Sequence, residues 1–508
     1  MKMLHLPIEM TENIFLHLTL QSMMNMKSVS KTHFTVGTKD YIWKHHFNLK
    51  YKMKDKLGQY EMLYKKYYNE SNKLTPKQAL RWGIKHKCTP FVINILQNNA
   101  FDILNYLPED RYIPIYAAAI RGLTEVVQLF ISSGFSKPDD TCVEDSTPLY
   151  VACQENHLET VKCLVKHGAN IEFSYREGFT PLYVACQRGN LDISKYLMDI
   201  GANINAQCVN GSTPLYIASQ EGHDEVVKLL LKHGANKNTI FRRGYTPLYV
   251  ACRNGHVKVA KILVEDGVNI NVVDNDGGTP LYTASQEGRH EVVKLLLGSG
   301  ADPQILFNGG YTPLYVASQN GHDKVVCALL QSPKTRLNYI APNGASSLYI
   351  ACQNGNLTSA KMLLEHGANC NIDISNGCSP LYISSHKGYE DIVALLLDYH
   401  VDVNYHNMTY NTALYDACCN GHLNIVKLLI SRDATVFDYF EGVIKNGNIL
   451  HKIINSSHYD VILFLLKTAP YLLYEKNNDN ISPLQLVYEL KSTYTINFIE
   501  TYLKGKLD

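Results

Sequence analysis

The stretch TPLYIASQEGHDEVVKLLLKHGAN, residues 213–236, contains the features that decide the fold. Thr213 can cap a helix that begins at Pro214, because the amide hydrogen that proline lacks has no partner in the first turn of a helix. Gly222 predicts the end of this short helix, and the valines and leucines that follow predict a second helix over 224–233. Residues 235–244 form an extended segment with a turn, so the predicted unit is helix, turn, helix, hairpin.

This unit recurs along the chain. The word Thr-Pro-Leu-Tyr recurs every 33 residues, starting at Thr147, Thr180, Thr213, Thr246, Thr279 and Thr312. Looser copies begin at Ser346, Ser379 and Thr412, and worn ones at Ile113, Asn448 and Ser482. The sequence therefore contains about twelve repeats. A unit this small can bury its apolar faces only against its neighbours, so we expect a solenoid about 100–120 Å long.

The words Thr-Pro-Leu, Ala-Cys or Ala-Ser, Gly-His, Val-Val-Lys-Leu-Leu-Leu and Gly-Ala-Asn, as at 180–205 and 213–236, resemble the ankyrin family. The resemblance implies an all-α solenoid, a monomer outside any complex, that binds target proteins on its concave face and hairpin tips. One departure is systematic, because tyrosine replaces the family's usual histidine after Thr-Pro-Leu. We expect these side chains to form a buried ladder: Tyr150, Tyr183, Tyr216, Tyr249, Tyr282, Tyr315, Tyr349, Tyr382 and Tyr415.

Composition excludes several classes of function. Lys plus Arg total 48 against 47 Asp plus Glu, which gives a net charge of +1 and argues against nucleic acid as a partner. The chain has no apolar run of about 18 residues, so we expect no membrane contact and an intracellular, cytoplasmic location. The sequence contains no phosphate loop, nucleophile motif or metal-ligand spacing, so we expect no cofactor, no metal site and no catalytic residues.

The 13 cysteines are interpreted by their place in the repeat. Cys153, Cys186, Cys252, Cys352 and Cys418 occupy one repeat position at which Ser219, Ser285, Ser318 and Ser385 stand in other copies. A position that accepts either residue needs a small side chain, so these cysteines are expected to be core thiols and not disulfides.

Residues 1 to about 70 do not follow the repeat period, and residues 1–50 resemble an F-box. The residues that carry this resemblance include Leu6, Pro7, Ile8, Ile14, Leu18, Val29, Ser30 and Trp43. It implies docking on a Skp-type adaptor and a cullin of a ubiquitin ligase, although Ser22-Met23 stands where the family usually has Asp-Leu. The alternative is a helical cap for the array. We therefore divide the chain into an F-box-like domain (1–50), a helical connector or cap with a degenerate repeat as an alternative (51–110), and the ankyrin array (111–508), whose last repeat is a cap.

Residues that differ between otherwise similar repeats are the candidates for target binding. On the predicted hairpin tips these are Arg176, Phe179, Phe241, Arg242, Arg243, Tyr245, Phe307 and Tyr311. Exposed aromatic rings and arginines suit interface anchors, and the arginines favour an acidic or phosphorylated patch on the partner. Alternatively, the aromatic rings shield their own turns. A row of glutamines on the first helices is either solvated or able to bind a peptide, with Arg253 and His386 in place of two of them.

The sequence therefore predicts a non-enzymatic protein, the substrate-recognition subunit of a cullin-RING ubiquitin ligase. The alternative is a scaffold or masking protein without that coupling. The order F-box then ankyrin array is similar to proteins of giant DNA viruses that infect amoebae, or of intracellular bacteria. The junction at 331–347 is expected to be the weakest point of the array, because Pro333 interrupts it and the repeat step lengthens to 34 residues.

Overall fold

The structure, a computed structural model, describes residues 76–87, 89, 92–93, 96, 114–142, 145–307, 309–372, 374, 377–409, 411–440, 443–489 and 492–505. The chain divides into two compact units, Met1–Val209 and Asn210–Asp508. The F-box-like segment lies outside the described residues.

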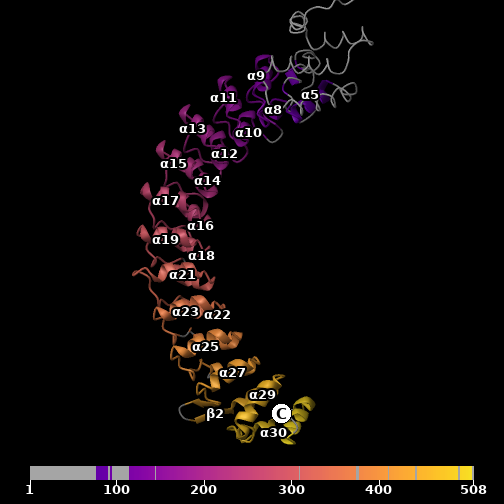
Figure 1. Cartoon of the computed structure of the whole chain (residues 1–508), viewed down its shortest axis with the longest axis vertical. Helices are drawn as coiled ribbons and strands as arrows, with labels where there is room; N and C mark the ends of the chain where they lie inside the picture. The colour runs from indigo at the N-terminus through magenta and orange to yellow at the C-terminus, as the bar shows by residue number, and fades with distance from the viewer. Residues whose placement is uncertain are drawn as a thin grey trace, which may run out of the picture. The chain divides into compact units, whose positions relative to one another are not determined.

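The described helices of the first unit form consecutive antiparallel pairs after an initial helix (Figure 1). They are α5 (Pro76–Lys85), α8 (Pro114–Ala119), α9 (Thr124–Ser132), α10 (Pro148–Gln154), α11 (Leu158–Lys166), α12 (Pro181–Gln187) and α13 (Leu191–Asp199). The worn copy at Ile113 forms the pair α8 and α9, and α5 packs against α8.

The second unit continues with the same pairs. They are α14 (Pro214–Glu221) and α15 (Asp224–Lys232), α16 (Pro247–Asn254) and α17 (Val257–Glu265), α18 (Pro280–Gln286) and α19 (His290–Gly298), α20 (Pro313–Gln319) and α21 (Asp323–Leu330), α22 (Ser347–Gln353) and α23 (Leu357–Glu365), α24 (Pro380–Lys387) and α25 (Glu390–Asp398), and α26 (Ala413–Cys419) and α27 (Leu423–Ile430). The first helices pack on one another in one row and the second helices in a parallel row (Figure 1). The helix bounds predicted for the repeat at Thr213 are confirmed, apart from one residue at the end of α15.

The C-terminal part of this unit departs from the regular repeat. A two-stranded antiparallel sheet, β1 (Phe437–Phe440) and β2 (Val443–Asn448), replaces the short hairpin after α27. Beyond it lie α28 (Ile449–Ile453), α29 (Tyr459–Thr468), η3 (Pro470–Leu473), α30 (Pro483–Glu489) and α31 (Thr493–Leu503). The worn copies at Asn448 and Ser482 therefore also form helix pairs.

The first helix of each regular repeat begins as its sequence predicts. Thr213 has an extended backbone, and its hydroxyl oxygen accepts a hydrogen bond from the amide of Tyr216 at 3.2 Å. The same bond joins Thr246 to Tyr249, at 3.2 Å. This cap satisfies one of the orphan amides of a helix that is only two turns long.

Polar side chains connect each repeat to its predecessor. His256 Nε2 donates to the carbonyl oxygen of Gln220 at 2.9 Å, and His322 Nε2 donates to that of Gln286 at 2.9 Å. Where asparagine replaces this histidine, Asn356 Nδ2 reaches the carbonyl oxygen of Ser318 at 2.8 Å. The histidine of Gly-His thus links each repeat to the preceding one.

A second set of polar links lies in the loops after the second helices. There a side-chain oxygen accepts the backbone amide of the residue 31 positions later. The pairs are Glu172 with Asn203 (2.7 Å), Asn271 with Asp302 (2.9 Å), Asn338 with Asn369 (2.9 Å) and Asn404 with Thr435 (2.8 Å). These bonds help to hold the spacing of adjacent repeats.

The buried core contains the predicted tyrosine ladder. Seven members, from Tyr150 to Tyr349, are buried, with exposed fractions between 4% and 9%. Tyr382 and Tyr415 are only half-buried, so the prediction of a fully buried ladder is wrong for these two. The core cysteines are thiols, and their repeat position is fully buried at Cys153, Cys186, Cys252 and Cys352.

We expect the protein to lose stability in alkali. Burial raises the pKa of Tyr150, Tyr282 and Tyr349 from 10.0 to about 12, and that of the Cys186 thiol from 9.0 to about 12. Between the unfolded and folded pKa values of these groups, the unfolded chain releases protons that the folded chain retains. The contribution of these groups to the free energy of unfolding is therefore complete below pH 9 and is lost as the pH rises towards 12. Urea midpoints should be similar at pH 7 and 8 and lower at pH 11. Equal midpoints at pH 8 and 11, or full ionisation of the native tyrosines at pH 11 by absorbance, would contradict this.

Candidate target-binding surface

Three hairpins carry an aromatic residue at both ends. They are Tyr175–Phe179, Phe241–Tyr245 and Phe307–Tyr311, and each is an isolated antiparallel bridge. The amide of the first aromatic residue donates to the carbonyl oxygen of the second, at 2.9, 2.8 and 3.0 Å respectively. The two rings of each pair are thereby attached to a closed turn.

Each ring also packs against a tyrosine of the ladder. Phe241 lies on Tyr216 with ring centroids 4.6 Å apart, and Tyr245 lies on Tyr249 at 4.6 Å. The remaining ring pairs in contact are Phe307 with Tyr282 (4.7 Å), Tyr311 with Tyr315 (4.9 Å), Phe179 with Tyr183 (4.9 Å) and Tyr175 with Tyr150 (5.0 Å). In each hairpin, the first ring thus packs against the ladder tyrosine of the preceding repeat, and the second ring packs against that of the following repeat.

The hairpin aromatics are therefore less accessible than predicted. The prediction of exposed rings is wrong, because the rings are half-buried; they are those of Phe179, Phe241, Tyr245, Phe307 and Tyr311. Each ring packs on its neighbour, as the shielding alternative expects, and still contacts solvent, so a role in target binding stays a prediction. A ring fixed in this way loses little entropy when a partner covers its remaining surface.

The three predicted arginines are exposed. The Arg176 guanidinium lies 5.3 Å from the centroid of the Tyr175 ring, a cation–π contact. Arg242 and Arg243 form the turn η2 (Arg242–Gly244), where Arg243 has a left-handed backbone with φ 64°. A residue other than glycine or asparagine in this conformation costs about 1 kcal/mol. The positive charges are therefore at the tip, in solvent.

The predicted glutamine row lies at the ends of the first helices. Gln286, Gln319 and Arg253 are exposed, and Gln154, Gln187, Gln220 and Gln353 are half-buried. The carbonyl oxygens of Gln220 and Gln286 accept the inter-repeat bonds from His256 and His322. The glutamine side chains are thus accessible to solvent, while the backbone carbonyl groups of two of these residues join adjacent repeats.

The structure also shows a polar cluster that the sequence patterns did not predict. Asp416, which is buried, accepts hydrogen bonds from the Tyr382 hydroxyl at 2.9 Å and from His386 Nδ1. Asn420 Nδ2 donates to the backbone oxygen of Asp416 at 2.8 Å. Burial and the bond to Asp416 raise the pKa of Tyr382. The available signal was an aspartate where other repeats have Val, Ile or Thr, adjacent in space to the histidine that replaces glutamine.

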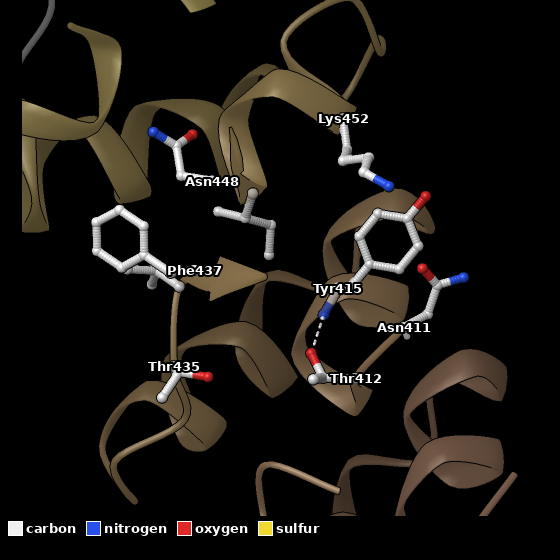
Figure 2. Close-up of a pocket in the computed structure, with 9 residues that line it drawn as sticks. Asn411, Thr412, Tyr415, Thr435, Phe437, Asn448 and Lys452 are labelled. Atoms are coloured by element: carbon white, nitrogen blue, oxygen red, sulfur yellow. Dashed lines mark hydrogen bonds between the residues drawn. The ribbon is translucent and has the colours of Figure 1, made fainter. Parts of the chain in front are cut away.

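A small pocket lies where the ladder ends, between α26 and the β1–β2 hairpin (Figure 2). Lys452 Nζ lies 5.3 Å from the Tyr415 ring centroid, and Asn411, Thr435 and Phe437 are among the other residues that line the pocket. The pocket is small and has room for water.

The described ranges also bear on metal and membrane binding. No group of three or more His, Cys, Asp or Glu side chains in these ranges has an arrangement that could hold a metal ion. None of the helices in the same part of the chain combines the length and the apolar character needed to cross a bilayer. The predicted F-box residues, from Leu6 to Trp43, lie outside these ranges.

Stacked helix pairs joined by hairpins define a class, the repeat solenoids that bind other proteins. A family model described as "Ankyrin repeats (3 copies)" matches overlapping segments that together span residues 80–438, more than half of the chain. The chain therefore belongs to the ankyrin repeat family, whose repeats mediate protein–protein interaction and are typical of non-catalytic scaffolds.

Solved structures of other proteins are also similar to this chain. A solved structure, the ankyrin repeat domain of human ASB11, is 28% identical, with 44% of this chain and 99% of that one covered and a TM-score of 0.41. The search of curated proteins gave no significant match.

Proposed function

We propose that this protein is the substrate-recognition subunit of a cullin-RING ubiquitin ligase and has no enzymatic activity of its own. Residues 1–50 would dock on a Skp-type adaptor, which binds the cullin, and the array over 111–508 would capture the target. Residues 51–110 would connect the two. If the protein acts in an infected amoeba, as its resemblance to giant-virus proteins implies, the adaptor would be that of the host.

The observation that supports target capture is the set of three rigid aromatic hairpins. Phe241 and Tyr245 are held by the ladder and still contact solvent, and Arg242 and Arg243 extend beside them. Interfaces use such aromatic and arginine side chains as anchors, because they provide a large contact area with little loss of entropy. This surface supports the proposal that the array captures a protein.

The adaptor half of the proposal rests on the sequence of residues 1–50 and predicts a direct test. The full-length protein should co-purify with a Skp-type adaptor when the two are co-expressed. Changing Leu6→Ala with Pro7→Ala should reduce the bound adaptor at least tenfold, because an F-box docks through its apolar face.

The matched control is Lys50→Ala with Lys52→Ala, which alters a basic run expected to be solvated and should leave adaptor binding unchanged. Full adaptor binding by the Leu6→Ala, Pro7→Ala protein would exclude the F-box interpretation. An array that retains its target but never recruits adaptor would identify a scaffold or masking protein instead.

A further inference from the structure

Between residues 175 and 345, hairpins with aromatic residues at both ends alternate with hairpins that lack them. In the second unit, the aromatic hairpins Phe241–Tyr245 and Phe307–Tyr311 begin 66 residues apart, which is two repeats. Between them lies Asp274–Gly278, and Ala341–Ala345 follows. In the first unit, the aromatic hairpin Tyr175–Phe179 begins 66 residues before Phe241–Tyr245 in sequence. Over this stretch the aromatic hairpins therefore recur every two repeats.

The fold does not require the aromatic rings at these positions. The hairpins at 274–278 and 341–345 close with the same backbone bond, at 3.0 Å in each, as the aromatic hairpins. Ala341 and Ala345 pack in a buried cluster with Tyr315 and Tyr349, so small residues fill the space between two ladder tyrosines. Because alanine serves the same structural purpose, the rings at every second hairpin need another explanation.

The rings form two defined groups in the second unit. The first aromatic cluster is Tyr216, Phe241, Tyr245 and Tyr249, and the second is Tyr282, Phe307, Tyr311 and Tyr315. In both, the ladder tyrosines are buried and the hairpin rings are half-buried. Each cluster is thus a pre-formed apolar anchor site at a hairpin tip, and the hairpin tip between the two carries no aromatic ring.

The charges around the clusters differ. Arg242 and Arg243 lie exposed on the first cluster, whereas the tip of the second carries Gly309 and Gly310. On the hairpin between them, Asp276 is exposed, while Asp274 is buried and accepts the amides of Asp276 (2.9 Å) and Gly278 (2.7 Å). Arg242 and Arg243 therefore attract acidic groups of a partner to the first cluster, whereas Asp276 repels them from the middle hairpin.

We propose that the tips from Phe241 to Tyr311 bind an extended segment of the target that carries two aromatic anchors about six residues apart, with acidic residues outside the anchor that meets the first cluster. Packed helices lie about 10 Å apart, so two repeats separate the clusters by about 20 Å. An extended chain advances about 3.3 Å per residue, and residues separated by an even number lie on one face. This inference deepens the target-capture half of the proposed function and does not depend on the adaptor.

Synthetic peptides test the spacing on the full-length protein by fluorescence anisotropy. The probe has two tryptophans at positions i and i+6, separated by Ser, Thr and Gly, with two glutamates before the first tryptophan. We expect it to bind at least tenfold more tightly than a peptide with one tryptophan, because the second anchor binds intramolecularly. Tryptophans at i and i+5 should lose this gain, since they lie on opposite faces of an extended chain.

Charge reversal tests the orientation. Arg242→Glu with Arg243→Glu should weaken the glutamate-flanked peptide about tenfold and leave a neutral version unchanged. The matched control, Lys228→Glu with Lys232→Glu on α15, makes the same charge change away from the tips and should have no effect on binding.

Three results would overturn the proposal: equal affinity for all spacings, equal loss with the control variant, or preference for a helical peptide with anchors about 13 residues apart, which span the same 20 Å. The adaptor experiment is independent, since peptide binding without adaptor binding would reject only the ligase role. Adaptor binding with no dependence on anchor spacing would reject only this inference.

Discussion

Replacing Gly222 with alanine should destabilise the protein by about 2–4 kcal/mol, well beyond the cost of an ordinary glycine substitution. Gly222 ends α14 with φ 81°, in the left-handed region. A Cβ placed there would lie 2.5 Å from His256 Nδ1 of the next repeat. The His256 ring would have to move and would lose its bond to the carbonyl oxygen of Gln220, although Asn254 also donates to that oxygen at 2.8 Å.

The same repeat provides the control for this substitution. Gly234 has φ 84°, and nothing lies within 4 Å of the position that a Cβ would occupy, so Gly234→Ala measures the backbone strain alone, about 1–2 kcal/mol. Urea denaturation followed by circular dichroism would compare the two variants. Equal losses for Gly222→Ala and Gly234→Ala would show that the contact with His256 is unimportant. The double variant Gly222→Ala, His256→Ala should lose less stability than the sum of the losses in the two single variants.

Truncation of a core leucine is the second change with a large expected effect. Leu230 lies in α15 with an exposed fraction of 0%. Leu230→Ala should cost about 2–5 kcal/mol, because it leaves a cavity between packed helices. Since each repeat is stabilised by its neighbours, the loss should also appear as faster hydrogen exchange in α17, which packs against α15.

Lys228→Ala on the same helix is the matched control, because Lys228 is exposed and its replacement should change stability by less than about 0.5 kcal/mol. Faster exchange confined to α15 would contradict coupling through the stack. A Leu230→Ala protein as stable as the Lys228→Ala protein would contradict the placement of Leu230 in the core.

The structure qualifies the expectation of a weak junction at 331–347. The Thr335 hydroxyl donates to the carbonyl oxygen of Leu329 at 2.6 Å, and Asn343 Nδ2 donates to the Tyr315 hydroxyl at 3.1 Å. Ala341 and Ala345 also lie in the buried cluster between Tyr315 and Tyr349. Side-chain bonds are thus present where the usual Gly-Ala-Asn loop is missing, and reduced coupling at this junction stays a prediction.

Features encoded within a few neighbouring residues were accessible from sequence. The Thr213 cap, Pro214 in the first turn and Gly222 at the end of the helix act over distances shorter than one repeat, so the bounds of α14 followed from them. The period of 33 residues then specified the stacking, because no other arrangement buries the apolar faces. The exposure of the candidate arginines was also predicted correctly, since side chains at the tip of a short hairpin extend into solvent.

Other features depend on residues about one repeat apart in sequence, whose distances no local pattern encodes. The packing of Phe241 against Tyr216 and the bond from His386 to Asp416 belong to this group. The 33-residue period predicted the stack of repeats, and the words within each repeat carried the resemblance to the ankyrin family. Packing between repeats decided which side chains remain accessible on it, because burial is a property of neighbours brought together by the fold.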